Sequence, residues 1–285
     1  MGLDFYLHQP FAQHALAAGT LVAVITGLVG PFVVTRGAAF AVHGTAELSF
    51  TGAAAGLLIA NDPVIGALLG SLVVATAIGL LGARQRERDS AIGVILAFGL
   101  GAGVYLLSHY HGFATEATNI LFGQIFGVSN RQLLLLLGVA CLVAVTMAVL
   151  YRPLLFASVD PDVAQARGVP TRAVGVAFLY VLALTVTEAA QIVGTLLVLS
   201  LAITPAAAAG RLSARPATVT ALSVTFALVA ADGGLLASLQ TNVKASVLVS
   251  TISFALYLGA RLAGTTLRTR RRPHHPAHPR RARPG

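Results

Sequence analysis

Tryptophan is absent from this sequence of 285 residues, and cysteine, lysine and charged residues in general are scarce. The single cysteine, Cys141, lies within an apolar run, and a lone cysteine excludes an internal disulfide. The single lysine, Lys244, belongs to no G-x-x-x-x-G-K-[ST] pattern, so the chain has no phosphate-binding loop of its own for ATP hydrolysis. The G-x-S-x-G and H-E-x-x-H patterns are absent as well, which argues against the hydrolases that they mark.

Apolar residues, by contrast, make up 56% of the chain, whereas only 10% of its residues are charged. A soluble domain of this length does not need so large an apolar fraction, so the composition predicts an all-α, polytopic transmembrane helical bundle. The opening residues lack a basic segment and a small-residue cleavage site, and we therefore expect the first apolar run to be retained as a span. Runs of about membrane-spanning length occur near residues 12–35, 41–60, 64–82, 91–108, 132–151, 172–187, 192–210, 218–236 and 245–260.

These runs predict a bundle of eight to nine spans. Nine spans place the N-terminus outside the cell, whereas a broken helix around residues 188–194 reduces the number of crossings to eight and places the N-terminus inside. In the nine-span arrangement the basic connectors all fall on one side, which the positive-inside rule assigns to the cytoplasm. These connectors contain Arg36; Arg84, Arg86 and Arg88; Arg152, Arg167 and Arg172; and Arg211 and Arg215.

The C-terminal segment differs in composition from the rest of the chain. We expect residues 1–265 to form one membrane domain. We expect residues 266–285, TLRTRRRPHHPAHPRRARPG, to form a disordered basic tail in the cytoplasm. The histidines of this tail are crowded by proline and arginine, so a solvated linker is favoured over a metal sensor. No aromatic residues accompany the arginines, which argues against binding of nucleic acid.

A polar segment at residues 152–171 separates two long apolar runs. Asp160 and Pro161 predict the start of a helix within it, because Asp is a favoured N-cap residue and Pro is favoured at the first helical position. Ala164 and Gly168 follow as two small residues spaced four apart, in the pattern D-P-x-x-A-x-x-x-G. Two interpretations are open: a surface that a soluble partner grips, or an ordinary loop helix with an N-cap and a C-terminal glycine.

This pattern resembles the cytoplasmic coupling helix of the permeases of binding-protein-dependent metal importers, the zinc and manganese branch of the ABC superfamily. Other segments are similar to the same family and occur in the same order. They are RGAAFAVHGTAELSFTG at 36–52, RERDSAIG at 86–93, LFGQIFGVS at 121–129 and QIVGTLLVLSLAITPAAAA at 191–209.

The resemblance implies a multi-pass permease subunit of the plasma membrane that moves a divalent metal ion and holds no permanent cofactor. It implies three protein partners: a separate cytoplasmic ATPase that grips the coupling helix, an extracytoplasmic metal-binding protein, and a second copy of the chain. A proton-driven secondary metal transporter is the alternative that the sequence leaves open.

His43 and Glu47 are the strongest candidates for metal ligands. Their spacing of four residues places both on one face of a helix, where an imidazole nitrogen and a carboxylate can share one cation. The resembled family carries Asp and His at these places, so the two ligand types occur here in altered order. The alternative is an internal hydrogen bond that neutralises two buried groups. This donor mixture favours zinc first and manganese second, and it disfavours copper(I), which prefers sulfur ligands.

Two further acidic residues are predicted to lie along the same pathway. Asp232 interrupts an apolar helix beside Gly233 and Gly234, which permit close approach of a neighbouring helix. Glu188 and Gln191 lie at the junction of two short apolar runs, where an unwound segment can direct carbonyl groups at an ion. The alternatives are a helix boundary for Asp232 and a solvated outer loop for Glu188. In a proton-driven transporter both acids become relay residues.

Overall fold

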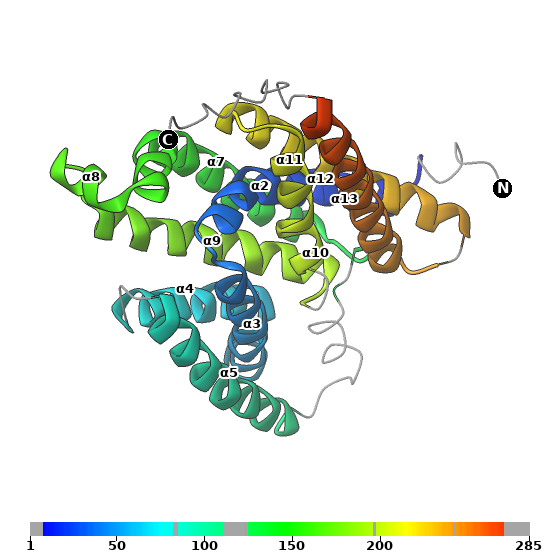
Figure 1. Ribbon diagram of the computed structural model, residues 1–285. Coiled ribbons are helices and arrows are strands. Elements are labelled where there is room, and N and C mark those ends of the chain that lie inside the picture. Colours follow the sequence, from blue (N-terminus) through cyan, green and yellow to red (C-terminus); the bar gives the residue numbers. More distant parts are fainter. Residues whose placement is uncertain are drawn as a thin grey trace, which may run out of the picture.

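The computed structural model describes residues 8–81, 85–110, 123, 125–195, 198–241 and 243–270, and every regular element in these ranges is a helix (Figure 1). The elements are α2 (Pro10–Thr35), α3 (Ala39–Ala60), α4 (Pro63–Leu81), α5 (Gln85–Ser108), α7 (Asn130–Val159), α8 (Pro161–Ala166), α9 (Thr171–Val193), α10 (Val198–Ala202), α11 (Thr204–Leu212), α12 (Pro216–Thr241) and α13 (Ala245–Arg270). The predicted all-α class is confirmed.

Six of the described helices, namely α2, α4, α7, α9, α12 and α13, are long and apolar enough to cross a membrane by length and composition. Two shorter apolar helices, Ile92–Ser108 and Val198–Leu212, accompany them. The predicted membrane bundle is therefore confirmed, whereas the predicted number of eight to nine spans is not. The expected domain boundary at residue 265 falls inside α13, and the tail after Arg270 lies outside the described residues.

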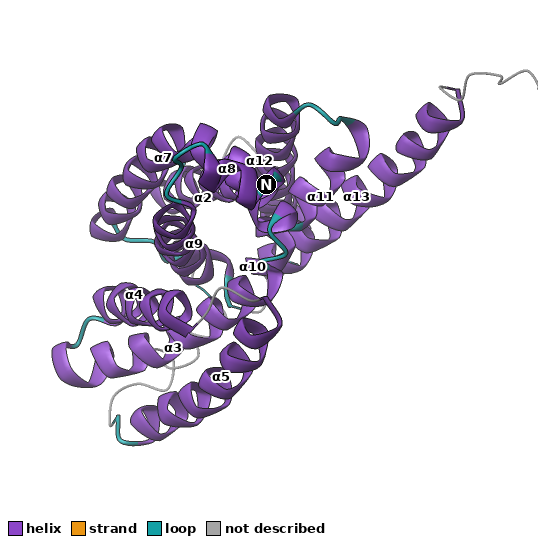
Figure 2. Cartoon of the chain, turned by 60° about the vertical axis from the view of Figure 1, so that its left-hand side comes forward, coloured by secondary structure: helices purple, strands orange, loops and turns teal. Residues whose placement is uncertain are grey.

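The helices form two groups that meet along α9. Helices α3, α4 and α5 pack together, and α4 joins them to α9; α2, α7, α11, α12 and α13 make up the other group (Figures 1 and 2). Glycines bring α3 and α4 into backbone contact, because a Cβ placed on Gly56 lies 2.6 Å from the Cα of Gly66. Small residues at helix contacts are characteristic of packing in membranes, where the backbones can approach closely.

Helix α9 corrects the predicted surroundings of Glu188. The helix continues without a break to Val193 and ends at Gly194, whose φ of +98° is a conformation that glycine adopts readily. Glu188 is therefore neither in an unwound segment nor in a solvated loop, but inside a helix and 3% exposed. The chain does break after this helix, and the short α10 and α11 that follow are too short to cross a hydrocarbon core of about 30 Å.

Candidate metal pathway and coupling helix

Helix α8 projects from the end of the bundle between α7 and α9 (Figure 1). Asp160 ends α7 and begins α8, and its Oδ1 accepts a hydrogen bond of 3.0 Å from the backbone N–H of Val163. Pro161 occupies the first turn, where its missing N–H leaves no intrahelical bond unmade. The helix start predicted at Asp160 and Pro161 is thus confirmed, and its cause is local capping.

The C-terminal end of α8 is followed by a glycine, Gly168. The N–H of Val169 donates to the carbonyl of Ala164 and that of Gly168 to the carbonyl of Gln165, each at 3.0 Å, which is the Schellman arrangement. Gly168 has a φ of +83°, yet a Cβ added there meets no atom within 4 Å. Glycine at position 168 is therefore favoured by the backbone conformation and not by crowding within this chain.

The exposed surface of α8 differs from the one expected from its small residues. Ala164 is fully buried against the chain itself, so it offers no surface to a partner. Val163 instead exposes 46% of its surface on this projecting helix. Exposed Asp162 and Gln165 flank it. The exposed surface of α8 therefore includes Val163 and its polar neighbours and excludes Ala164.

His43 and Glu47 lie one turn apart on α3, and both are half-buried. Nδ1 of His43 is buried and has no hydrogen-bond partner within the described part of the chain. A neutralising hydrogen bond between this atom and Glu47 is therefore absent. A buried polar atom without a partner costs free energy, and a deprotonated ring nitrogen in this state can accept a hydrogen bond or bind a metal ion.

Glu188 and Gln191 lie one turn apart on α9 and border a small cavity of about 20 Å³, together with Val64, Val128, Gln132 and Ile192. Oε1 of Glu188 and Nε2 of Gln191 are buried and have no hydrogen-bond partner in the described residues. A space of this volume holds about one water molecule or ion. The two orphaned atoms and the cavity together mark a polar pocket inside an apolar bundle.

Asp232 lies within α12, so the expected alternative of a helix boundary is wrong. Its carboxylate accepts bonds of 3.1 and 3.3 Å from the hydroxyl of Thr20 on α2. Gly234 makes the predicted close approach: a Cβ placed there lies 2.7 Å from the backbone nitrogen of Val249 on α13. Asp232 thus joins α12 to α2 at a point where three helices meet.

The predicted metal ligands do not form one cluster in this structure. Among the described residues, no group of three or more His, Cys, Asp or Glu side chains is close enough to hold a metal ion. The residues in question are His43, Glu47, Glu188 and Asp232. They occupy separate positions on α3, α9 and α12.

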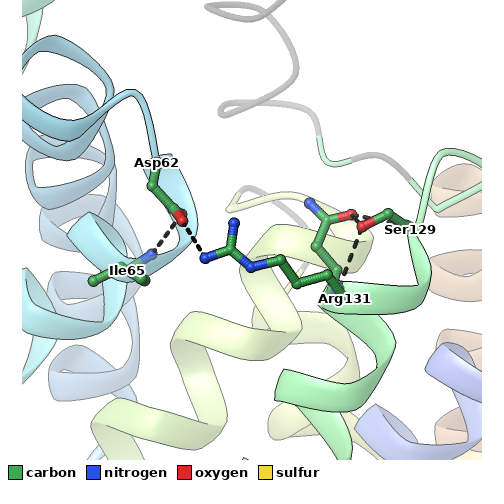
Figure 3. A network of polar contacts seen from close by, with 5 residues as sticks. Asp62, Ile65, Ser129 and Arg131 are labelled. Carbon is green, nitrogen blue, oxygen red and sulfur yellow. Dashed lines mark hydrogen bonds and ion pairs between the residues drawn. The ribbon is translucent and has the colours of Figure 1, made fainter.

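An ion pair that was not predicted from the sequence lies where α4 and α7 begin (Figure 3). Asp62 and Arg131 approach to 3.0 Å, with side chains 18% and 72% exposed. Two local signals point to it in retrospect. Asp62 precedes a proline at a helix start, and Arg131 is a basic residue outside the connectors that the positive-inside rule assigns to the cytoplasm.

A bundle of long apolar helices that holds one buried and several half-buried ionisable side chains is typical of membrane proteins that move ions or polar solutes. Residues 8–264 match the model of the ABC 3 transport family. The chain belongs to this family. It is therefore a multi-pass plasma-membrane permease of a metal ABC importer, which is a transport component and not an enzyme on its own.

Individual relatives agree with this assignment over most of their lengths. The chain is 32% identical to the manganese transport system membrane protein MntC of Halalkalibacterium halodurans, covering 89% of this chain and 88% of the relative. It is 27% identical to the high-affinity zinc uptake system membrane protein ZnuB of Haemophilus influenzae, covering 86% and 95%. The solved structure of PsaBC from Streptococcus pneumoniae in complex with Fab superposes with a TM-score of 0.82 at 26% identity, covering 93% of this chain and 98% of the other.

Proposed function

We propose that this chain forms the translocation pathway for zinc, with manganese as the second candidate, in an importer driven by a separate ATPase. Two copies of the chain assemble side by side, and the α8 helix of each docks on one ATPase subunit. An extracytoplasmic metal-binding protein delivers the ion. The names of the relatives support both metals, since MntC is a manganese protein and ZnuB is a zinc protein.

The observation that carries the proposal is the orphaned Nδ1 of His43 one helical turn from Glu47. An imidazole nitrogen and a carboxylate together suit zinc or manganese. Two ligands from one helix also leave the remaining coordination positions open. Weak, incomplete coordination is needed here, because a site that must release its ion cannot be a closed structural site.

Transport follows an alternating-access cycle. ATP binding closes the ATPase subunits, and α8 transmits this movement to α7 and α9, the two helices that flank it. Glu188 lies on α9 and therefore moves with the coupling helix, and we include it, with Asp232, among the pathway residues. The transported ion is substrate and not a resident cofactor. The proton-driven secondary transporter is not favoured, because the chain belongs to an ABC family.

Metal content of cells tests the proposal. Deleting the gene is expected to lower cellular zinc, measured element by element, and the intact gene is expected to restore it only together with an active ATPase. A partner ATPase whose phosphate-loop lysine is replaced provides the control. Full restoration with the inactive ATPase contradicts the proposal.

The basic tail is expected to be dispensable for transport. Truncation after Thr269 removes six of the seven tail arginines and all three tail histidines but no apolar span. We expect near-normal uptake and a modest change in the efficiency or orientation of membrane insertion, since cytoplasmic arginines bias orientation. Uptake and protease accessibility of the membrane protein measure the two effects. Complete loss of uptake in a correctly inserted variant makes the tail a functional element.

A further inference from the structure

Two cavities adjoin at the ends of α4, α7 and α9. The outer one has a volume of about 200 Å³ and is bordered by Asp62 and Arg131, among other residues. The inner one contains Glu188 and Gln191. Both cavities are lined by Val64 and Gln132, so these two side chains form the wall between them. The side chains of Val64 and Gln132 therefore separate the Asp62–Arg131 ion pair from the buried carboxylate of Glu188.

This end of the bundle is the one opposite to α8. Arg131 is in the first turn of α7, and α8 follows the last turn of that helix of 30 residues. At a rise of 1.5 Å per residue the two ends are separated by roughly 45 Å, more than the thickness of a hydrocarbon core. Since α8 faces the cytoplasmic ATPase in the proposed function, the two cavities face the outside.

The ion pair bridges two helices across a third. Helices α4 and α7 both pack on α9, and Asp62 and Arg131 reach toward one another from their ends (Figure 3). The two oxygens of Asp62 have separate roles: Oδ2 pairs with Arg131, and Oδ1 accepts a bond of 3.2 Å from the N–H of Ile65. A capping box between Ser129 and Gln132 fixes the start of α7.

The ion pair between Asp62 and Arg131 can break readily. Arg131 is mostly exposed, and an ion pair with an exposed member is weak because water replaces the partner readily. Asp62 is the less exposed member, and it presents a carboxylate at the outer cavity. A divalent cation that reaches this carboxylate competes with the guanidinium for it and repels the guanidinium. In the inner cavity, Glu188 offers an unpartnered carboxylate oxygen, a ligand that hard and borderline divalent cations accept.

We propose that Asp62 is the first carboxylate to receive the incoming divalent cation and that its ion pair with Arg131 is a latch over the Glu188–Gln191 pocket. Cation binding at Asp62 releases Arg131, and the ion then passes Val64 and Gln132 to reach Glu188. The inference rests on the proposed function for its direction, with the outer cavity on the receiving side of the membrane.

Thiol labelling tests the latch without relying on transport. Val128 lines the inner cavity and is 7% exposed, and cysteine is close to valine in size. Val128→Cys is made in the full chain together with Cys141→Ala, which removes the native thiol, and the chain is expressed with its ATPase. A small, membrane-impermeant, cationic methanethiosulfonate is then added from outside the cells. The labelling rate is measured with and without manganese ions, which bind thiolates less strongly than zinc ions do.

Adding Arg131→Gln is expected to raise the labelling rate by about fivefold or more, because the latch is lost. Arg261→Gln, at an exposed position on α13, is the matched control and is expected to leave the rate unchanged. Manganese is expected to accelerate labelling when the latch is intact. Asp62→Asn retains a favoured N-cap and so the start of α4, but manganese is expected to have no further effect in it. Equal rates with and without Arg131, or a manganese effect that persists in Asp62→Asn, overturn the latch.

A reversible cross-link provides a second measurement, in which the bridged and the unbridged states of one and the same variant are compared. In the Cys141→Ala background, Asp62→Cys and Arg131→Cys are bridged with a bis-methanethiosulfonate, and a reductant then removes the bridge. We expect uptake to stop when α4 and α7 are joined and to recover on reduction, with the unbridged variant as its own control. Undiminished uptake by the bridged protein contradicts the latch. If labelling behaves as expected but no metal is transported, the proposed function fails while the latch stands.

Discussion

Replacing His43 or Glu47 by alanine is expected to remove most metal uptake, at least about tenfold, which is the loss typical even for residues that only orient a metal ligand. The double variant is expected to be little worse than either single one, because two ligands of one site are not additive. Uptake of zinc and manganese by cells expressing each variant measures the effect. Ser49→Ala is a matched control on the same helix, since the hydroxyl of this buried residue donates to the carbonyl of Ala46.

Glu47→Gln separates a metal ligand from a hydrogen-bond partner. It keeps the size of the side chain and its capacity for hydrogen bonds but removes the charge, so a ligand loses function and a neutral partner largely keeps it. Glu47→His moves the pair toward nitrogen donors and is expected to shift preference toward zinc. Wild-type uptake of both metals by Glu47→Gln refutes the metal site, even though the family assignment remains.

Replacing Gly168 by valine is expected to abolish both uptake and association with the ATPase while leaving membrane insertion intact. The physical reason is conformational: the φ of +83° costs an L-residue roughly 1–2 kcal/mol, and a β-branched residue is the least suited to it. Distortion at this residue moves the end of α8. Copurification of the ATPase with the tagged permease is the measurement.

Gly168→Asn is the matched control, because asparagine tolerates the left-handed conformation and a Cβ at this position has open space. It is expected to keep most ATPase association. Val163→Asp tests the contact surface itself, since this side chain is 46% exposed and its replacement leaves the core of the permease unchanged. We expect it to weaken copurification strongly. Normal copurification of both Gly168→Val and Val163→Asp contradicts the assignment of α8 as the docking helix.

The features that the sequence predicts well are those with local causes. The start of α8 follows from the capping chemistry of Asp160 and the geometry of Pro161, and its end from the conformational freedom of Gly168. The apolar runs likewise predicted the positions of the long helices, because membrane-spanning length is visible in composition.

The features that it missed depend on tertiary packing. Glu188 was expected in an unwound or solvated segment because an acid interrupts an apolar run, but α9 continues past it and the surrounding helices bury it. The pairing of Asp62 with Arg131 joins two helices that are separated by α5 in sequence, and the local signals at each residue do not specify that the two pair with one another. Ala164 faces its own chain, which spacing alone did not reveal.

Transport by the purified protein tests the central claim most directly. The permease is reconstituted into proteoliposomes with its ATPase inside and the metal-binding protein outside, and accumulation of radioactive zinc and manganese is measured. The predicted result is accumulation that requires ATP in the lumen, favours zinc, and is lost with Glu47→Gln. Accumulation without ATP, driven by an imposed proton gradient and unaffected by an inactive ATPase, contradicts the claim and identifies a secondary transporter instead.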